Sequence, residues 1–327
     1  KDAKENLGIE EGTIIVMDPR SGKILALANT PGFDPNKYAV QGNFSVFQNP
    51  AVQKIFEPGS VFKPVTMAAA LQEKKVTPET TYQDQGILKI GGSSIENYDK
   101  RIWGKKTMRE VLEFSINTGA VFAKEQLGDD KFLEYIEKFG IFEPTGIDLP
   151  GEAYSKNREL RQGREINLAT AAFGQGVEMT QLQLLRAYSA FANRGKMAEP
   201  FLVKERAKEQ GQVLSSETAT TITSMLVSVV GEGYSKKARI PGYYIAGKTG
   251  TAQISWSALG IKQAGYSDKT AQSFMGYAPA FNPQFLILVK LQNPQTKTAE
   301  YSALPIFHTL AKYIIDYLAI PPDYEVE

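Results

Sequence analysis

The chain has 327 residues, of which 42% are hydrophobic, enough for one large domain with two lobes or for two ordinary domains. Lys and Arg number 37 against 36 for Asp and Glu, and the net charge of +1 provides no basic field for a nucleic-acid or anionic-membrane partner. The absence of cysteine excludes thiol nucleophiles, disulfides and thiolate metal sites.

The first predicted element is a β-hairpin. In TIIVMDPRSGKILALAN, residues 13–29, two apolar and β-branched runs flank a D-P-R-S-G turn, so a sheet should begin near residue 13. Residues 34–55 are polar without clear periodicity, which predicts a loop. Helical spacing resumes at VFKPVTMAAALQEKK, and the middle of the chain is then mostly helical.

The middle segment contains helix start and stop signals. TMREVLEF opens with Thr107 and carries Glu110 three residues on, the capping-box spacing, so a short helix should end near Phe114. A further helix is expected at 216–230, and the charge run KERAKEQGQ at 204–212 predicts a solvated turn. Three other segments combine helical apolar spacing with a closing glycine: TGAVFAKEQLG, DKFLEYIEKFG and MTQLQLLRAYSAFANRG.

The chain returns to strands after residue 243, in YYIAGKTGTAQ, SFMGYAPA and QFLILVKLQ, and a helix with the single histidine, His308, follows. TAQSFMGYAPAFNPQFLILV at 270–289 has membrane-span length, but its prolines predict two strands joined by a turn. Strands at both chain ends predict an α+β fold in which helices cover an antiparallel sheet.

An all-helical lobe is expected to be inserted between the two parts of that sheet, with the active site in the cleft between lobe and sheet. We place the sheet lobe at about residues 1–59 and 231–327 and the helical lobe at about 60–230. No repeat, linker or low-complexity tract divides the chain, so a single domain is predicted.

The stretch FEPGSVFKP, residues 56–64, places Lys63 three residues after Ser60. Residues i and i+3 are neighbours on a helix, so Lys63 can reach the Ser60 hydroxyl, and Pro64 favours the first helical turn. Ser60 should therefore lie at a helix N-terminus, where N–H groups and the dipole stabilise an oxyanion. A lysine base must be neutral, so we expect burial and a second cation to lower its pKa. His308 has no obvious carboxylate partner, which disfavours Ser-His-Asp catalysis.

The sequence K-T-G, Lys248 to Gly250, on a predicted strand offers the second cation. Gly250 leaves room for a substrate backbone to pair with the strand edge, and Thr249 and Thr251 add hydroxyls there. These residue types on a strand edge favour a binding site for an extended peptide.

The sequence S-I-N, Ser115 to Asn117, falls between two predicted helices, where both polar side chains can point into a cleft. Ser115 can relay a proton between the lysines and a leaving nitrogen, and Asn117 can hold a substrate amide by its donor and its acceptor. Each motif alone occurs by chance in many chains. Together, in this order and on these elements, the three motifs indicate one serine and lysine active site.

With S-x-x-K, S-x-N and K-T-G in this order, the chain resembles the penicillin-binding protein and serine β-lactamase superfamily. From about residue 12 to 324 it is similar to class B penicillin-binding proteins, in stretches such as FEPGSVFKP, TGIDLPGE, FGQGVEMTQLQLLRAYSAFANRG, AGKTGTAQ and SFMGYAPAFNP. The resemblance implies D,D-transpeptidation of peptidoglycan. A D-Ala-D-Ala stem peptide acylates the serine, D-Ala leaves, and an amine of another stem resolves the ester.

The resemblance also implies a role for each motif residue. The backbone N–H groups of Ser60 and Thr251 should form the oxyanion hole, with Ser60 as nucleophile and Lys63 as its base. The residues with expected catalytic roles are Ser60, Lys63, Ser115 in the proton relay, and Lys248. The residues expected to bind substrate are Asn117, Thr249, Gly250 and Thr251, with Lys248 and Thr249 near the substrate carboxylate.

The implied partners are peptidoglycan stem peptides, β-lactam antibiotics that acylate Ser60 as substrate mimics, and a membrane glycosyltransferase in the cell. We expect no nucleic acid, metal ion or cofactor. The implied location is the extracytoplasmic face of the bacterial plasma membrane. The implied role is in cell division or in the maintenance of cell shape, and the S-I-N motif does not distinguish between these two roles. Family members usually carry an N-terminal membrane helix and a pedestal domain. We expect both to be absent here and the chain itself to be soluble.

Two alternatives remain open from the sequence. A serine β-lactamase or D,D-carboxypeptidase shares the three motifs but resolves the acyl-enzyme with water, which needs a base poised over the ester. The segment between Asn117 and Lys248 offers several candidate bases: Glu143, Glu152, Glu159, Glu165 and Glu178. A non-catalytic penicillin-binding sensor would be acylated once and would turn over no substrate.

Overall fold

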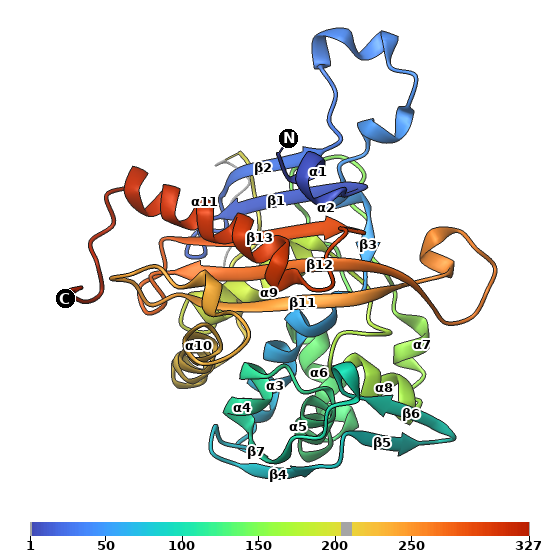
Figure 1. The fold of residues 1–327 in the computed structure, drawn as a ribbon, viewed down its shortest axis with the longest axis vertical. Helices are drawn as coiled ribbons and strands as arrows, with labels where there is room; N and C mark the ends of the chain where they lie inside the picture. The colour runs from blue at the N-terminus through green and yellow to red at the C-terminus, as the bar shows by residue number, and fades with distance from the viewer. Residues whose placement is uncertain (1, 204–210, 327) are drawn as a thin grey trace.

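The computed structural model describes residues 2–203 and 211–326, and its centre is a five-stranded antiparallel sheet (Figure 1). The strand order is β11-β12-β13-β1-β2, so the two chain ends build one sheet, as predicted. Most of the charge run predicted as a solvated turn, residues 204–210, lies outside the described residues. The strands are β1 (Glu11–Met17), β2 (Ile24–Thr30), β11 (Ala246–Ser255), β12 (Tyr266–Ala278) and β13 (Phe285–Gln292).

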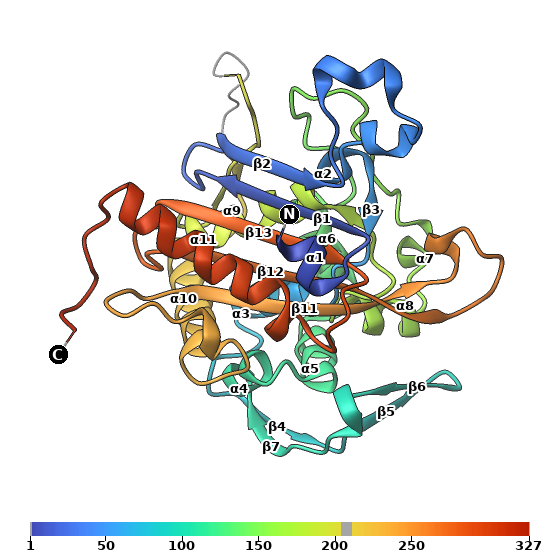
Figure 2. The ribbon, with the colours of Figure 1, turned by 45° about the horizontal axis from the view of Figure 1, so that its top comes forward.

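The sheet is covered on both faces, which explains why β13 reads as the nearly continuous apolar run FLILVKL. Successive side chains of a strand point to opposite faces. Ile287 and Val289 pack with Phe307 of helix α11 (Ala303–Tyr317), which runs along the sheet in Figure 2. Leu286 and Leu288 belong instead to the larger core shared with the helices on the other face.

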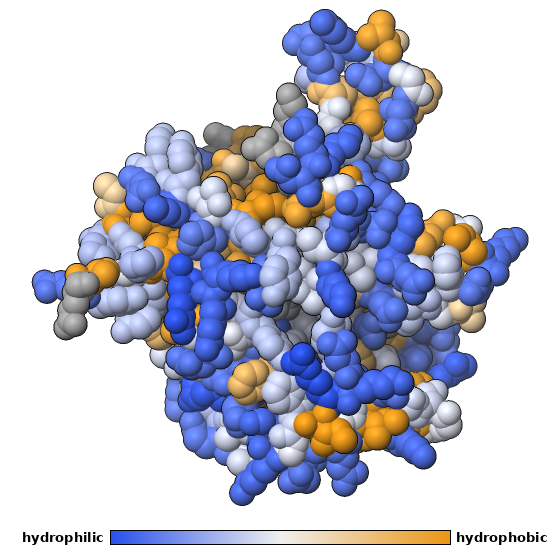
Figure 3. Space-filling view, viewed as in Figure 1, coloured by the Kyte–Doolittle hydropathy of each residue, from blue (hydrophilic) through white to orange (hydrophobic). Residues whose placement is uncertain are grey.

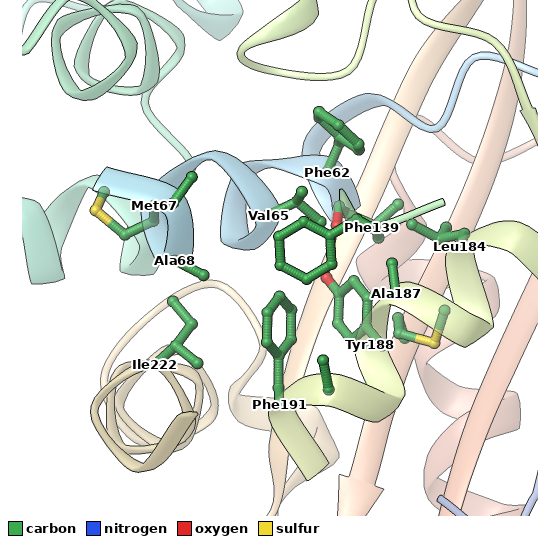
Figure 4. Packing of buried hydrophobic residues seen from close by; sticks show 14 of the residues in the cluster. Phe62, Val65, Met67, Ala68, Phe139, Leu184, Ala187, Tyr188, Phe191 and Ile222 are labelled. Carbon is green, nitrogen blue, oxygen red and sulfur yellow. The ribbon is translucent and has the colours of Figure 1, made fainter. Parts of the chain in front are cut away.

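The lobe on that other face is built around helix α3 (Lys63–Gln72), whose residues from Lys63 to Leu71 are all buried. Figure 4 shows the packing of α3 against α9 and α10 through Val65, Phe191 and Ile222. The hydroxyl of Tyr188 donates to the carbonyl oxygen of Val61 at 2.6 Å, which ties α9 to the start of α3. The other main helices, all predicted, are α4 (Met108–Glu113), α5 (Asn117–Leu127), α6 (Asp129–Lys138), α9 (Gln181–Ala192) and α10 (Ser216–Gly231).

The predicted capping box at the start of α4 is confirmed. The Glu110 N–H donates to the Thr107 hydroxyl oxygen at 3.2 Å, and the Thr107 N–H donates to the Glu110 carboxylate at 2.9 Å. The helix ends on Phe114, as the sequence indicated. This fixed end matters because Phe114 is followed at once by the S-I-N motif.

The lobe is mainly helical, as predicted, but it is not all-helical. Besides the two-residue pair of β9 (Lys196–Met197) with β10 (Gly211–Gln212), it contains two antiparallel strand pairs in which each strand has four residues and alternates in burial only weakly. Runs this short show no periodicity that separates them from loops. The pairs are β4 (Thr81–Asp84) with β7 (Gly104–Thr107), and β5 (Ile87–Ile90) with β6 (Ser93–Glu96).

Residues 31–48, which follow β2, project from the body of the molecule (Figures 1 and 2). The sequence predicted a loop at residues 34–55, but this segment contains three helical elements that are too short to show apolar periodicity. Phe44 and Tyr38 are exposed, and Figure 3 shows hydrophobic side chains on the projecting part. Among the described residues, no helix is both long and apolar enough to cross a bilayer. The short elements here are η1 (Pro35–Val40), η2 (Phe44–Phe47), α2 (Pro50–Gln53) and β3 (Ile55–Phe56).

The remaining short elements connect the larger ones. β3 pairs with β8, and β9 pairs with β10. These elements are α1 (Asp2–Leu7), α7 (Arg158–Arg161), α8 (Glu165–Ala171), β8 (Met179–Thr180), β9 (Lys196–Met197) and β10 (Gly211–Gln212).

Candidate active site

Ser60 lies in the 3-10 turn η3 (Gly59–Phe62), which continues directly into α3, so it occupies the helix start that the sequence predicted. Gly59 has a φ of +62°, and its N–H donates to the carbonyl oxygen of Gly174 at 2.9 Å. A Cβ at Gly59 would lie only 2.8 Å from the Cβ of Ala252. The glycine therefore lets the serine turn pack closely against strand β11.

Lys63 reaches Ser60 from one helical turn further on. Its amine nitrogen lies 2.9 Å from Ser60 Oγ, and the residue is only 1% exposed. The same nitrogen lies 2.5 Å from the carbonyl oxygen of Ser115 and 2.8 Å from Asn117 Oδ1. A fourth contact, to Ser115 Oγ, is 3.1 Å long. The S-x-x-K and S-x-N motifs therefore meet at one amine.

The contacts of the Lys63 amine can all be assigned in its neutral form, the form that a base requires. A neutral amine has two N–H groups and one lone pair. The carbonyl oxygens of Ser115 and Asn117 only accept hydrogen bonds, so they take the two N–H groups. The lone pair is then free to accept the hydroxyl proton of Ser60. In this state the hydrogen-bond geometry suits a base next to a nucleophile.

Lys248 on β11 supplies the second amine. It is 1% exposed, and its nitrogen lies 2.9 Å from Ser115 Oγ and 3.1 Å from the carbonyl oxygen of Thr249. Burial lowers the pKa of Lys248 to about 7. Burial, and after it the charge of Lys248, lowers the pKa of Lys63 well below its usual value. Desolvation is thus the main cause of the low pKa, and the second cation that the sequence offered adds to it.

Ser115 bridges the two lysines, with its hydroxyl oxygen 3.1 Å from one amine and 2.9 Å from the other. It adopts a φ of +55°, a left-handed conformation that costs a non-glycine residue about 1 kcal/mol or more. Ser115 occupies the turn between α4 and α5, where its N–H donates to the Leu112 carbonyl at 3.2 Å. The strained turn places the hydroxyl between the amines.

Asn117 begins α5 and lines the cleft, but its side chain already has partners. Its Oδ1 accepts from Lys63, and its Nδ2 donates to the carbonyl oxygen of Glu96 at 2.9 Å. The role expected from the sequence was to hold a substrate amide by the donor and the acceptor of this side chain. One N–H and one lone pair remain for that purpose, because an amide side chain has two of each.

The K-T-G residues lie on β11, which is the edge strand of the sheet. Thr249 and Thr251 both line the cleft, and Thr251 Oγ1 accepts from the N–H of Ala299 at 3.2 Å. The Thr251 hydroxyl therefore also connects β11 to the segment that leads into α11.

Gly250 needs a different explanation from the one that the sequence suggested. A Cβ there would lie 2.6 Å from Ser273 Oγ, 2.9 Å from a methyl carbon of Val61 and 3.0 Å from the carbonyl oxygen of Pro58. The missing side chain would thus point into the protein, toward the serine turn, and not toward a substrate. We attribute the glycine to close packing between β11 and η3.

These residues surround one cleft of about 700 Å³ between the sheet and the helical lobe. Lys63, Lys248 and Gly250 do not line the cleft, and the two lysines are buried beneath it. His308 lies on α11 and is not part of the cleft wall. The predicted residues that do line it are Ser60, Ser115, Asn117, Thr249 and Thr251.

A buried network that no sequence motif indicated holds the S-I-N motif in place. The side-chain oxygen of Asn97 accepts from the Asn117 N–H at 3.0 Å and from the Thr118 N–H at 3.2 Å. The carboxylate of Asp84, only 1% exposed, accepts from Asn97 Nδ2 and from the Thr118 hydroxyl. An Asp and an Asn in a loop-like segment carried no signal of burial.

Glu57 was also missed, although it stands three residues before Ser60. Its carboxylate accepts from the Gly176 N–H at 3.1 Å and from the Tyr266 hydroxyl at 2.8 Å. Burial raises the pKa of Glu57. Its place within the FEPGSVFKP stretch was the one signal that pointed to it. Glu57 links the approach to the serine turn with β12.

Within residues 2–203 and 211–326, no three His, Cys, Asp or Glu side chains come together in a group that could hold a metal ion. The chemical groups of the cleft are instead hydroxyls, amines and amides. Their arrangement can activate a serine oxygen, hold a peptide along a strand edge and move a proton between two amines.

Residues 12–312 match the family model described as penicillin binding protein transpeptidase domain. The chain belongs to this family. Its similarity to the penicillin-binding proteins therefore extends over nearly all the described structure, and it falls in the class B branch that the sequence motifs indicated. The order of the three motifs indicated the superfamily, and the stretches around them indicated the class B branch.

Two relatives and one solved structure illustrate the similarity. Stage V sporulation protein D of Bacillus subtilis is 35% identical over 94% of this chain and 49% of its own length. A peptidoglycan D,D-transpeptidase FtsI homolog of Mesostigma viride is 29% identical over 98% of this chain and 59% of its own. The crystal structure of penicillin binding protein 3 from Mycobacterium tuberculosis with ampicillin has a TM-score of 0.90 and 30% identity, and covers 99% of this chain and 76% of that one. This chain spans about half the length of the curated relatives it matches.

Proposed function

We propose that this protein is a serine D,D-transpeptidase that cross-links peptidoglycan stem peptides through an acyl-enzyme on Ser60. The observation that carries the proposal is the buried amine of Lys63, 2.9 Å from Ser60 Oγ and linked through Ser115 to Lys248. The names of relatives support it, since one is a peptidoglycan D,D-transpeptidase homolog and a similar structure holds ampicillin. β-Lactams would accordingly acylate Ser60.

In the first half-reaction, Ser60 Oγ attacks the carbonyl carbon of the penultimate D-Ala and its proton passes to the neutral Lys63 amine. The backbone N–H groups of Ser60 and Thr251 stabilise the oxyanion of the tetrahedral intermediate. The proton then moves through the Ser115 hydroxyl to the leaving nitrogen. The C–N bond breaks, D-Ala leaves with that proton, and the ester on Ser60 remains.

In the second half-reaction, an amine of another stem peptide attacks the ester carbon. The amine gives up one proton along the same path, the C–O bond to Ser60 breaks, and Ser60 Oγ is protonated again. Thr249, which lines the cleft, binds the substrate carboxylate above the positive charge of the buried Lys248, while Asn117 and the edge of β11 hold the donor stem. The proton that Ser60 loses to D-Ala in the first half-reaction is thereby replaced in the second by a proton from the acceptor amine.

The five glutamates considered as bases for water lie outside the cleft wall, which argues against hydrolysis through any of them. Glu152 accepts from the N–H groups of Thr145 and Gly146, and Glu178 accepts from the Ser155 hydroxyl. Glu159 and Glu165 are exposed on the surface. A β-lactamase would need a base near the ester, so these positions support slow deacylation by water.

We further propose that residues 1–327 act as one transpeptidase domain, with its sheet lobe at about 1–59 and 231–327 and its helical lobe at about 60–230. The cleft between the lobes supports this division. The substrate chemistry would place the reaction at the extracytoplasmic face of the bacterial plasma membrane, beside a membrane glycosyltransferase that supplies glycan strands. The family resemblance supports these last two points.

The test is incubation with a D-Ala-D-Ala stem pentapeptide and an acceptor stem peptide, followed by mass spectrometry. A cross-linked dimer and one released D-Ala per cross-link are expected for the wild type, and neither for Ser60→Ala. Release of D-Ala with tetrapeptide as the only peptide product would make the protein a carboxypeptidase. Acylation without any product would make it a sensor.

A further inference from the structure

One end of the cleft is built from aromatic rings and an arginine. Phe114 stacks on Trp103 with 4.9 Å between ring centroids, and its edge contacts Tyr234 at 6.0 Å. Arg101, Phe114 and Tyr234 line the cleft. The N–H of Tyr234 donates to the carbonyl oxygen of Glu113 at 3.1 Å, which fixes this residue to α4. We call Arg101, Trp103, Phe114 and Tyr234 the aromatic end.

The guanidinium of Arg101 is held in place, but several of its N–H groups are available to bind a ligand. Nη1 donates to the Tyr234 hydroxyl, and the guanidinium carbon lies 5.8 Å from the Trp103 ring and 5.9 Å from the Tyr234 ring. The side chain is still 47% exposed. A guanidinium has five N–H donors, and the bond to Tyr234 is its one hydrogen bond to the described residues. Such a preorganised fork favours a carboxylate ligand.

The aromatic end lies on the Ser115 side of the nucleophile. Phe114 directly precedes Ser115, whose hydroxyl contacts Lys248 near the start of β11. The opposite end of the cleft is lined by Gln253, five residues further along the strand, or about 16 Å at the usual rise per residue. The serine turn packs against Ala252, between these two ends.

The chemistry of the proposed reaction indicates which end of the cleft binds the acceptor and which end binds the acyl donor. The second half-reaction is the reverse of the first with a different amine, so the attacking nitrogen must occupy the place that the D-Ala nitrogen left. In both steps Ser115 exchanges a proton with that nitrogen. The acceptor therefore enters from the Ser115 side, next to Phe114, and the acyl donor occupies the side toward Gln253.

We propose that the aromatic end is the acceptor subsite and that Arg101 binds a carboxylate of the acceptor stem peptide. The aliphatic chain that carries the attacking amine packs on the rings of Phe114 and Tyr234. This inference rests on the proposed transpeptidase function and adds its acceptor specificity: an amine joined through an aliphatic chain to a carboxylate.

The acidic side chains near Arg101 determine how strongly its guanidinium can bind the carboxylate of an acceptor. Asp99 Oδ2 lies 3.9 Å from Arg101 Nη2, too far for a hydrogen bond but close enough to reduce the positive charge. Glu300 also lines the cleft, but its carboxylate lies 3.4 Å from the amine of Lys237. Asp99 is therefore the neighbour whose removal should strengthen carboxylate binding.

The experiment compares two acceptor tripeptides that end in lysine, one with a free C-terminal carboxylate and one with a carboxamide, at equal concentration. Acyl-enzyme from a D-Ala-D-Ala thioester donor is partitioned between them, and products are counted by mass spectrometry. The wild type should prefer the carboxylate about tenfold, the size expected from one charge-assisted contact. Arg101→Gln should reduce that preference to less than about twofold, and Asp99→Asn should increase it.

Arg109→Gln is the matched control, because Arg109 pairs with Glu79 at 3.0 Å and does not line the cleft. It should keep the wild-type preference. Equal use of the two acceptors by the wild type, or an unchanged preference in Arg101→Gln, would overturn the inference. Donor acylation is recorded in the same samples. A wild type that forms the acyl-enzyme but transfers to neither peptide would contradict the transpeptidase function itself.

Discussion

The amine of Lys63 lies 2.9 Å from the hydroxyl oxygen of Ser60 and is sealed from solvent. A charged ammonium is costly in such a place, and both of the carbonyl oxygens around it are satisfied by two N–H groups. The pair is therefore arranged for transfer of a proton from serine to lysine. The first two predictions follow from this relationship.

Lys63→Ala should reduce acylation by benzylpenicillin by about 10³-fold or more, because Ser60 loses its base. Stopped-flow or gel-based acylation rates measure the change. Lys124→Ala is the matched control, since Lys124 is also a buried lysine but pairs with Asp129 at 2.5 Å and does not line the cleft. It should lose stability and yet be acylated at the normal rate when folded. Equal rates for wild type and Lys63→Ala would remove this lysine from the mechanism.

The acylation rate should depend on pH through both lysines. Below the lowered pKa of Lys63 its amine is protonated and cannot accept the serine proton, so the rate rises as pH increases through that pKa. Above the pKa of Lys248, about 7, the positive charge beneath the substrate carboxylate is lost and the rate should fall. Because the two lysines interact, the rising and falling parts of the pH profile report apparent pKa values of the pair and not of either residue alone.

Lys248→Arg should remove the falling limb, because a guanidinium stays charged throughout this range. Thermal denaturation would verify that the variant is folded. A wild-type rate that is flat from about pH 5 to about pH 10 would contradict a lysine base.

Ser115→Gly and Ser115→Ala should both lose most acylation activity, since each removes the hydroxyl between the two amines. Their stabilities should differ. Glycine adopts a φ of +55° without strain, whereas alanine does not, so the glycine variant should be more stable by about 1 kcal/mol. Urea denaturation measures the difference. Equal stabilities would show that the turn relaxes when the serine is removed.

Gly250→Ala should cost about 1–3 kcal/mol of stability and slow acylation, because the new Cβ would push β11 away from the serine turn. Adding Ser273→Ala should recover part of the loss. It removes the nearest atom, the Ser273 Oγ at 2.6 Å, which is buried without a hydrogen-bond partner in the described structure. The control is Gly231→Ala, where a Cβ meets nothing within 4 Å. A Gly250→Ala variant that matches this control would refute the packing explanation.

Local spacing predicted the parts of the site that depend on local geometry. The distance from Ser60 to Lys63 is set by one helical turn, and the end of α4 is set by the Thr107 capping box. The sheet built from both chain ends followed from strand patterns at each end. These features depend on a few consecutive residues.

Features that depend on distant segments could not be predicted. The contact between Arg101 and Tyr234 joins residues 133 positions apart, and neither carries a motif. The role of Gly250 depends on Val61 and Pro58, which approach it through tertiary packing. The strands β4 to β7 are too short for a periodic signal. Asp84 lies in such a short strand, so its burial in the folded protein could not be predicted from the sequence.

The most direct test of the account is the intact mass of wild type and Ser60→Ala after incubation with benzylpenicillin, followed over hours. The account predicts one stable penicillin adduct, located by peptide mapping on Ser60 and absent from the variant. An adduct that forms equally on Ser60→Ala would contradict the nucleophile. Rapid loss of the adduct with accumulation of hydrolysed drug would contradict the transpeptidase and identify a β-lactamase.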